Sequence, residues 1–96
     1  MFDTIVKRDG RSVPYDIEKI ATAISKAMAA SGRRDEGQSL TLAQDCEARL
    51  AQRFPDSPPG VEDIQDMVET SIMGMRGYEV AQKYVRYRYK RELARK

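Results

Sequence analysis

Basic and aromatic side chains near the two ends of the chain are the residues best suited to bind a charged ligand. Two adjacent cations, Lys7 and Arg8, stand just before a tight turn. In the last predicted helix, Tyr84, Arg88 and Arg91 are spaced i, i+4 and i+7, so they share one face. Arginine binds phosphate through a two-pronged fork, lysine acts as a point charge, and aromatic rings stack on bases. The pattern therefore predicts a site for a ligand that carries phosphate and a base.

Each of these features also has a purely structural interpretation. Charges at Lys7 and Arg8 can protect an edge strand from aggregation, and strand alternation sends them to opposite faces unless the turn twists them. The tyrosines can form a half-buried stripe beside a basic solvent face. Lys19 stands in the first turn of a helix capped by Asp16, where free N–H groups favour anions, but a cap and a solvated lysine also explain that pair.

The charges are distributed unevenly along the chain, although the whole chain of 96 residues carries a net charge of only +2. Residues 1–34 carry seven basic and four acidic groups, residues 35–69 two basic and nine acidic groups, and residues 76–96 eight basic and two acidic groups. If the two basic ends meet in space, they form a cationic site that suits a polyanion. The alternative is that helix surfaces of opposite sign simply pair across a bundle.

Missing residue types exclude most catalytic chemistry. The chain has no histidine and a single cysteine, Cys46, so it lacks the commonest acid–base group and cannot build a zinc cluster alone. Neither a GxxxxGK(S/T) loop nor a GxGxxG fingerprint is present. We therefore expect no catalytic residue, no metal ligand and no nucleotide hydrolysis, and binding without turnover is typical of a sensor.

The chain also lacks an apolar run of the ~20 residues that span a bilayer and an apolar signal region at its start, so we expect a reduced, cytoplasmic location and no membrane partner.

Turn and periodicity signals predict a single α+β, mainly α domain over residues 1–96. Two β-prone runs flank Asp9-Gly10, which is a strong signal for a hairpin over about residues 4–15. Apolar residues at helical spacing then predict four helices, at about 16–31, 40–53, 61–74 and 78–95, with a polar loop over 33–38. A short hairpin cannot stand alone, so we expect it to form a lid over a four-helix bundle.

The same periodicity predicts which side chains face the core. Cys46 is most simply a small core residue in this pattern. The expected inward or half-buried positions are Ile17, Ile20, Ile24, Ala27 and Met28, then Leu42, Ala43, Cys46 and Leu50, then Ile64, Met67, Val68, Ser71 and Ile72, and finally Val80, Ala81, Tyr84, Val85 and Tyr87.

Three ordered blocks give the chain a family resemblance. They are VKRDGRSVPYDIEKIATAISKA at 6–27, VEDIQDMVE at 61–69 and GYEVAQKYVRYRYKR at 77–91. Together they resemble the ATP-cone domain, which occurs at the N-terminus of ribonucleotide reductases and in a bacterial repressor of their genes. The family's fold is a small hairpin lid over a four-helix bundle, in agreement with the fold predicted from the residues.

The resemblance implies allosteric sensing, in which ATP leaves the reductase active and dATP shuts it down, commonly by changing the oligomeric assembly. It implies a ligand of ATP or dATP, with or without Mg²⁺. It also implies protein partners, either the catalytic domain of a parent reductase or neighbouring cones in an oligomer. The ending YVRYRYKR and a start near Met1 most resemble the anaerobic, glycyl-radical class of reductase. The chain itself is then regulatory and not an enzyme.

The resemblance also carries over a set of ligand-binding positions. The exact partner among Arg88, Lys90 and Arg91 is left open, because the alignment can slip there within one helical turn. The implied residues are Lys7 and Arg8 for the phosphates, Asp16 and Lys19 for the base and the phosphates, Ile5 and Ile20 for the apolar walls, Gln65 toward the phosphates, and Tyr84, Arg88 and Arg91 on the last helix.

Three alternatives remain at this stage. The chain can be the ATP-cone of a transcriptional repressor, although a zinc ribbon with paired cysteines is then expected before the cone. It can be a nucleic-acid-binding module that uses the basic segment 76–96, although the acidic middle of the chain argues against nucleic acid as a partner. It can also be a helical interaction domain without a ligand.

Overall fold

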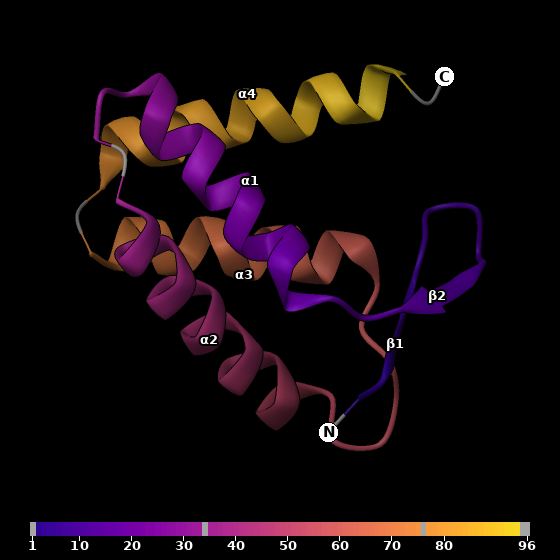
Figure 1. Cartoon of the computed structure of the whole chain (residues 1–96). Helices are drawn as coiled ribbons and strands as arrows, with labels where there is room; N and C mark the ends of the chain where they lie inside the picture. Colours follow the sequence, from indigo (N-terminus) through magenta and orange to yellow (C-terminus); the bar gives the residue numbers. More distant parts are fainter. Residues whose placement is uncertain (1, 34, 76, 95–96) are drawn as a thin grey trace.

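The computed structural model describes residues 2–33, 35–75 and 77–94, and side chains as far as residue 91. A two-stranded hairpin is followed by four helices, so the predicted α+β, mainly α fold with a hairpin and four helices is confirmed (Figure 1). The hairpin stands at the end of the bundle where α1 and α3 begin and α4 ends. The elements are β1 (Thr4–Val6), β2 (Ser12–Pro14), α1 (Ile17–Ala30), α2 (Glu36–Arg53), α3 (Val61–Gly74) and α4 (Tyr78–Ala94).

The hairpin is antiparallel, with Ile5 opposite Val13. Its strands are shorter than the predicted runs, because Lys7 to Gly10 form a turn in which the Gly10 N–H donates to the Lys7 carbonyl (2.9 Å). Gly10 has a φ of 89°, in the left-handed region that glycine adopts freely. The Asp9 carboxylate accepts from the Arg11 N–H and Nε, and these bonds lower the pKa of Asp9. The turn therefore interrupts the strand alternation just where the two adjacent cations stand.

Helix α1 is capped at both ends, and the cap at its start is the predicted one. The Asp16 carboxylate accepts from the Glu18 N–H (3.0 Å) at its start. Ser31 is the C-terminal cap, and the Gly32 that follows it has a φ of 76°. This left-handed glycine ends the helix at low steric cost.

Helix α2 begins at Glu36, four residues before the predicted start, so the expected polar loop over 33–38 was wrong for residues 36–38. Asp35 is the reason, because its carboxylate accepts from the Gln38 N–H (3.0 Å) and caps the helix. The Ser39 N–H then donates to the Asp35 carbonyl. The polar residues and Gly37 suggested a loop, but an aspartate cap with a glutamate in the first turn stabilises a helix start.

The start of α3 anchors the hairpin. The Val6 N–H donates to the Pro59 carbonyl (3.0 Å), and Val6 forms a parallel bridge with Gly60. Asp63 accepts from the Gly60 N–H and so closes the first turn of α3.

Residue 95, the predicted end of the last helix, lies outside the described residues, and α4 is described as far as Ala94. No helix in the described ranges is long and apolar enough to cross a membrane.

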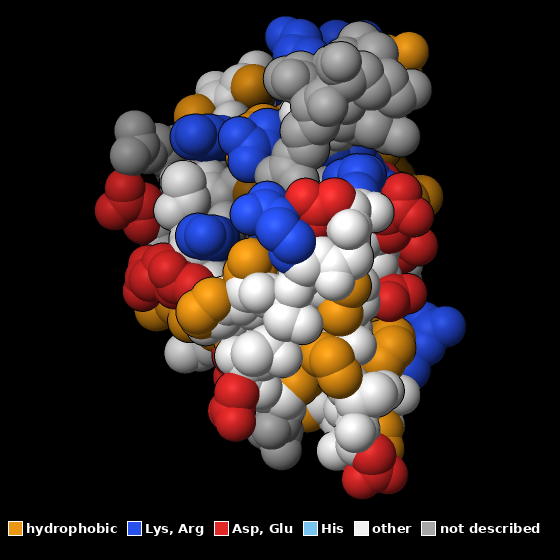
Figure 2. Space-filling model, turned by 90° about the vertical axis from the view of Figure 1, so that its right-hand side faces the viewer, with side chains coloured by type: hydrophobic (Ala, Val, Ile, Leu, Met, Phe, Trp, Pro, Cys, Tyr) orange, Lys and Arg blue, Asp and Glu red, His pale blue; other side chains and the backbone are white. Residues whose placement is uncertain are grey.

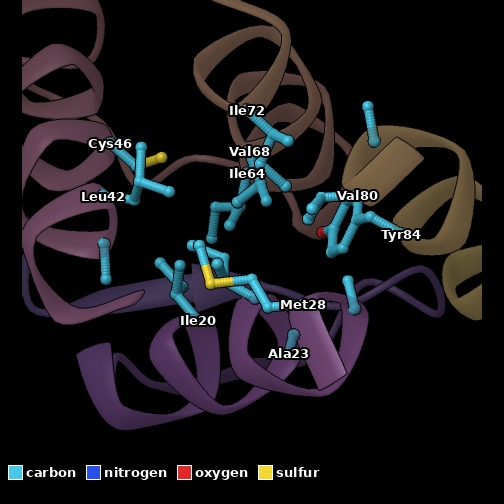
Figure 3. Packing of buried hydrophobic residues seen from close by; sticks show 14 of the residues in the cluster. Ile20, Ala23, Met28, Leu42, Cys46, Ile64, Val68, Ile72, Val80 and Tyr84 are labelled. Carbon is cyan, nitrogen blue, oxygen red and sulfur yellow. The ribbon is translucent and has the colours of Figure 1, made fainter. Parts of the chain in front are cut away.

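The helices form a ring in which α1 packs on α2 and α4, and α3 packs on the same two. Side chains from all four helices point toward one another in the centre (Figure 3). Every predicted core position on α1, α2 and α3 is buried or half-buried, including Cys46, whose burial raises the pKa of its thiol. Val85 is an exception on α4, because 44% of it is exposed. Phe2 was not predicted, yet it is buried and packs edge-on against Tyr15.

Candidate functional site

A cavity of about 140 Å³ lies between the hairpin, the first turns of α1 and α3, and α4, and we call it the hairpin cavity. Nine of the ten site residues predicted from the sequence line it, and Arg88 does not. Residues from both ends of the chain therefore meet around one space. Its lining residues are Ile5, Lys7, Arg8, Val13, Pro14, Tyr15, Asp16, Lys19, Ile20, Ala23, Val61, Ile64, Gln65, Val68, Tyr84, Tyr87 and Arg91.

The inner wall of the hairpin cavity is apolar and aromatic. Ile20, Ile64 and Val68 belong to the buried core, and Tyr84 is only 3% exposed. The ring of Tyr87 stacks on that of Tyr84 with 6.2 Å between centroids, and Lys26 Nζ lies 5.9 Å from the Tyr87 ring centre. Such a wall can accept the flat face of an aromatic ligand.

The charges around the hairpin cavity are mostly positive. Among the described lining residues, four cations stand against one carboxylate, Asp16, whose oxygen already accepts from the Glu18 N–H. Lys and Arg side chains gather on the face of the molecule where the hairpin and the end of α4 lie (Figure 2). Low-dielectric walls around like charges focus the field in a cleft, so this site attracts anions. The four cations are Lys7, Arg8, Lys19 and Arg91.

The hairpin turn explains how two neighbouring cations reach the same cavity. In a regular strand Lys7 and Arg8 would point to opposite faces. Here Arg8 lies inside the turn that Gly10 closes, and the alternation no longer applies. Both side chains line the hairpin cavity. Strand alternation required the turn to redirect Lys7 and Arg8 if both were to reach one site, and the turn does so.

Arg8 joins the hairpin to α3. Its Nη2 donates to Oε1 of Gln65 (3.0 Å), and its Nε lies 3.5 Å from Oε1 of Glu62. The Arg8 side chain is 22% exposed. Its Nε is buried and makes no hydrogen bond. The guanidinium is thus held at the cavity with part of its donor capacity unused.

Arg88 instead joins α4 to α3. Its Nη1 donates to Glu69 (2.6 Å) and to Asp66 (2.9 Å). Burial alone would lower the pKa of this guanidinium, but the bonds to Glu69 and Asp66 outweigh burial, and the pKa is raised. At about 100° per residue, Arg88 and Tyr87 lie on opposite sides of Tyr84 along the helix. Arg88 therefore turns to the acids of α3, and Tyr87 turns to α1.

Tyr15 lines the hairpin cavity but was not among the predicted site residues. Its hydroxyl donates to Oε2 of Glu47 on α2 (2.8 Å). Burial, and then this bond, raise the pKa of Tyr15 well above its ordinary value. Its position beside Asp16, at the end of the predicted lid, could have indicated a wall residue. Nothing in the sequence pairs it with Glu47, 32 positions away.

We expect the stability of the domain to fall at alkaline pH because of two tyrosines. The pKa values of Tyr15 and Tyr84 are both raised above 10, mainly by burial. The folded state keeps protons that the unfolded chain releases near pH 10, so the free energy of unfolding falls as the pH rises above about 10. Urea titrations at several pH values should show this fall in the free energy of unfolding with pH. Tyr15→Phe or Tyr84→Phe should make the fall less steep. Tyr89→Phe, in which the exposed ring is kept, is the control, and an equal slope in all variants would contradict the assignment.

Side chains that commonly ligate metal ions are not clustered in the part of the chain that the structure describes. No group of three or more acidic, cysteine or histidine side chains is gathered there. The carboxylate at the hairpin cavity, Asp16, is engaged in capping α1.

Together, these features define a four-helix domain whose hairpin covers a cationic cavity walled by tyrosines. A sequence model of this kind of domain, described as the ATP cone domain, matches residues 3–93. The chain belongs to the ATP-cone family.

Relatives of the chain are ribonucleotide reductases of three kinds. It is 34% identical, over 95% of its length, to an anaerobic ribonucleoside-triphosphate reductase of Haemophilus influenzae. It is 38% identical, over 99% of its length, to a vitamin B12-dependent ribonucleoside-diphosphate reductase of Thermoplasma acidophilum. Identity to a ribonucleoside-diphosphate reductase subunit alpha of Chlamydia muridarum is 32% over 96% of the chain. The chain spans 13%, 13% and 10% of the length of these relatives, respectively.

Proposed function

We propose that this chain is a nucleotide-sensing allosteric domain that binds ATP or dATP in the hairpin cavity and thereby switches the overall activity of a ribonucleotide reductase. The observation that carries the proposal is the convergence of Lys7, Arg8, Lys19 and Arg91 on a cavity with a tyrosine wall. Residues from both ends of an ATP-cone chain contribute to it.

The size and charge of the hairpin cavity suit this ligand. Sites that enclose a whole small molecule occupy ~300–1,000 Å³, whereas this cavity holds about 140 Å³. The base would therefore enter between Ile20 and Tyr84, and the phosphates would remain at the mouth. A triphosphate carries roughly four negative charges, and several converging cations are needed to compensate for its desolvation.

Allosteric control is supported by the fact that several separate elements of the fold form the walls of the hairpin cavity. The hairpin, α1, α3 and α4 each supply lining residues, so a bound nucleotide would fix their relative positions. The partner that responds would be the catalytic domain of a parent reductase in the cytoplasm, or neighbouring cones in an oligomer. The chain itself would bind without catalysing, with Mg²⁺ carried by the phosphates when it is present.

Direct binding tests this proposal. We expect ATP and dATP to bind with micromolar dissociation constants, about −8 kcal/mol, and to raise the melting temperature, since a ligand stabilises the state that binds it. Isothermal titration calorimetry and a thermal-shift scan with ATP, dATP and GTP would measure both effects. No heat and no shift with any nucleotide would favour a ligand-free interaction domain. Binding of DNA or RNA that falls steeply with salt would favour the nucleic-acid module.

A further inference from the structure

We infer that Glu62 lowers the nucleotide affinity of the hairpin cavity, because its carboxylate competes with ligand phosphates for the Arg8 guanidinium. This inference rests on the proposed function. Glu62 is not a lining residue of the cavity and was not predicted as part of the site. It acts on the ligand through Arg8.

The geometry places the competitor beside the cation. Glu62 Oε1 lies 3.5 Å from Arg8 Nε, on the first turn of α3. The Glu62 side chain is 62% exposed, whereas the Arg8 side chain is 22% exposed. Acidic side chains also lie next to the gathered Lys and Arg side chains on this face (Figure 2). Glu62 therefore holds Arg8 from the solvent side.

Arg8 is ready to exchange its partner. A guanidinium has five N–H donors, and one Arg8 hydrogen bond, to Gln65, is well formed. The Nε donor is buried without a hydrogen bond, although Glu62 is within ion-pair distance. A buried donor without a partner is costly. Phosphate oxygens at the mouth of the cavity could accept from it with better geometry than Glu62 does.

Carboxylate and phosphate recognise the same fork of arginine donors. A nucleotide that binds through Arg8 must therefore weaken or replace the contact with Glu62, and the remaining negative charge opposes the triphosphate. Both effects lower the affinity and speed dissociation. Gln65 differs because its amide is uncharged, so it can keep Arg8 aimed at the cavity while phosphate binds.

Glu62→Gln tests the inference, since glutamine keeps the shape of the side chain and removes its charge. We expect ATP to bind about 3- to 5-fold more tightly to this variant, the scale of an exposed ion pair, as measured by calorimetry at low salt. The gain should shrink as salt is added. Asp45→Asn is the matched control, because it makes the same charge change on α2, where Asp45 pairs with Arg49, and the ATP affinity should stay unchanged.

A double-mutant cycle then shows whether Glu62 acts through Arg8. In an Arg8→Ala background, Glu62→Gln should improve ATP affinity much less than in the wild type, because only the direct repulsion between the Glu62 carboxylate and the triphosphate is then removed. An equal gain with and without Arg8, or no gain in the single variant, would overturn the inference while leaving ATP binding by the wild-type chain intact. Absence of ATP binding by the wild-type chain would overturn the proposed function and the inference together. Glu62→Gln should not raise the melting temperature of the ligand-free chain, because an acidic residue in the first turn stabilises a helix.

Discussion

Replacing Arg8 with alanine is expected to weaken ATP binding on the order of 10- to 150-fold, or about 1.5–3 kcal/mol, the scale of a lost hydrogen bond to a charged group. Arg8 lines the hairpin cavity and is held there by Gln65 at 3.0 Å. Its fork can bind two phosphate oxygens at once, which no other residue type reproduces. Lys7→Ala is expected to cost a similar amount, because Lys7 lines the same cavity. Calorimetry with ATP would measure both variants.

Arg11→Ala is the matched control for these two variants. Arg11 belongs to the same hairpin and carries the same charge, but its side chain is 69% exposed and pairs with Asp9. It does not line the hairpin cavity. We expect its loss to leave ATP affinity within about twofold, since surface ion pairs contribute little. If Arg8→Ala and Lys7→Ala both bind ATP as the wild type does, these residues do not belong to the site.

Most of the fold could be predicted because local signals and periodicity agree. Asp9-Gly10, the Asp16 cap and the glycine after Ser31 each mark a boundary by a defined backbone requirement. The early start of α2 escaped prediction because the Asp35 cap competed with a polar, glycine-containing segment. The exposure of Val85 was not predicted, because α4 buries only a narrow stripe of side chains. Residue type alone does not separate a valine just outside this stripe from one inside it.

The candidate site could be predicted only as far as each residue's own helix or turn determines its direction. Lys19 and Arg91 were expected at the site and line the cavity. The Arg88 side chain points instead to Asp66 and Glu69, because the two acids lie on the adjacent face of α3. The helix spacing of α4 alone does not show which neighbouring helix each side of α4 meets. Contacts between distant segments, such as Tyr15 with Glu47, require the assembled bundle.

The cavity and the core depend on each other, since Ile20, Ile64, Val68 and Tyr84 belong to both. A ligand at the hairpin cavity therefore contacts the same side chains that hold the helices together. Mutations in the core can change binding by reducing the folded fraction, even where they do not touch the site. A core position far from the cavity separates the two effects.

Leu50→Ala is expected to cost about 2–5 kcal/mol of the free energy of unfolding, through lost burial and the void that remains. Leu50 is fully buried on α2 and does not line the hairpin cavity. A domain of this size has a total stability of about 5–15 kcal/mol. Since each kcal/mol lowers the melting temperature of such a domain by ~4–8 °C, the variant should lose at least ~8 °C. Urea denaturation and thermal melting would measure the loss. Val85→Ala is the control on the exposed side of α4, and its effect should stay within ~0.5 kcal/mol.

ATP should restore much of what Leu50→Ala removes. A ligand that binds only the folded state adds about 2.7 kcal/mol when its free concentration is 100 times its dissociation constant. Because the truncated side chain lies outside the hairpin cavity, the folded fraction of the variant should bind ATP as the wild type does. Arg8→Ala combined with Leu50→Ala should regain far less stability at the same ATP concentration. Equal recovery in both would mean that ATP stabilises the domain at some other place than the hairpin cavity.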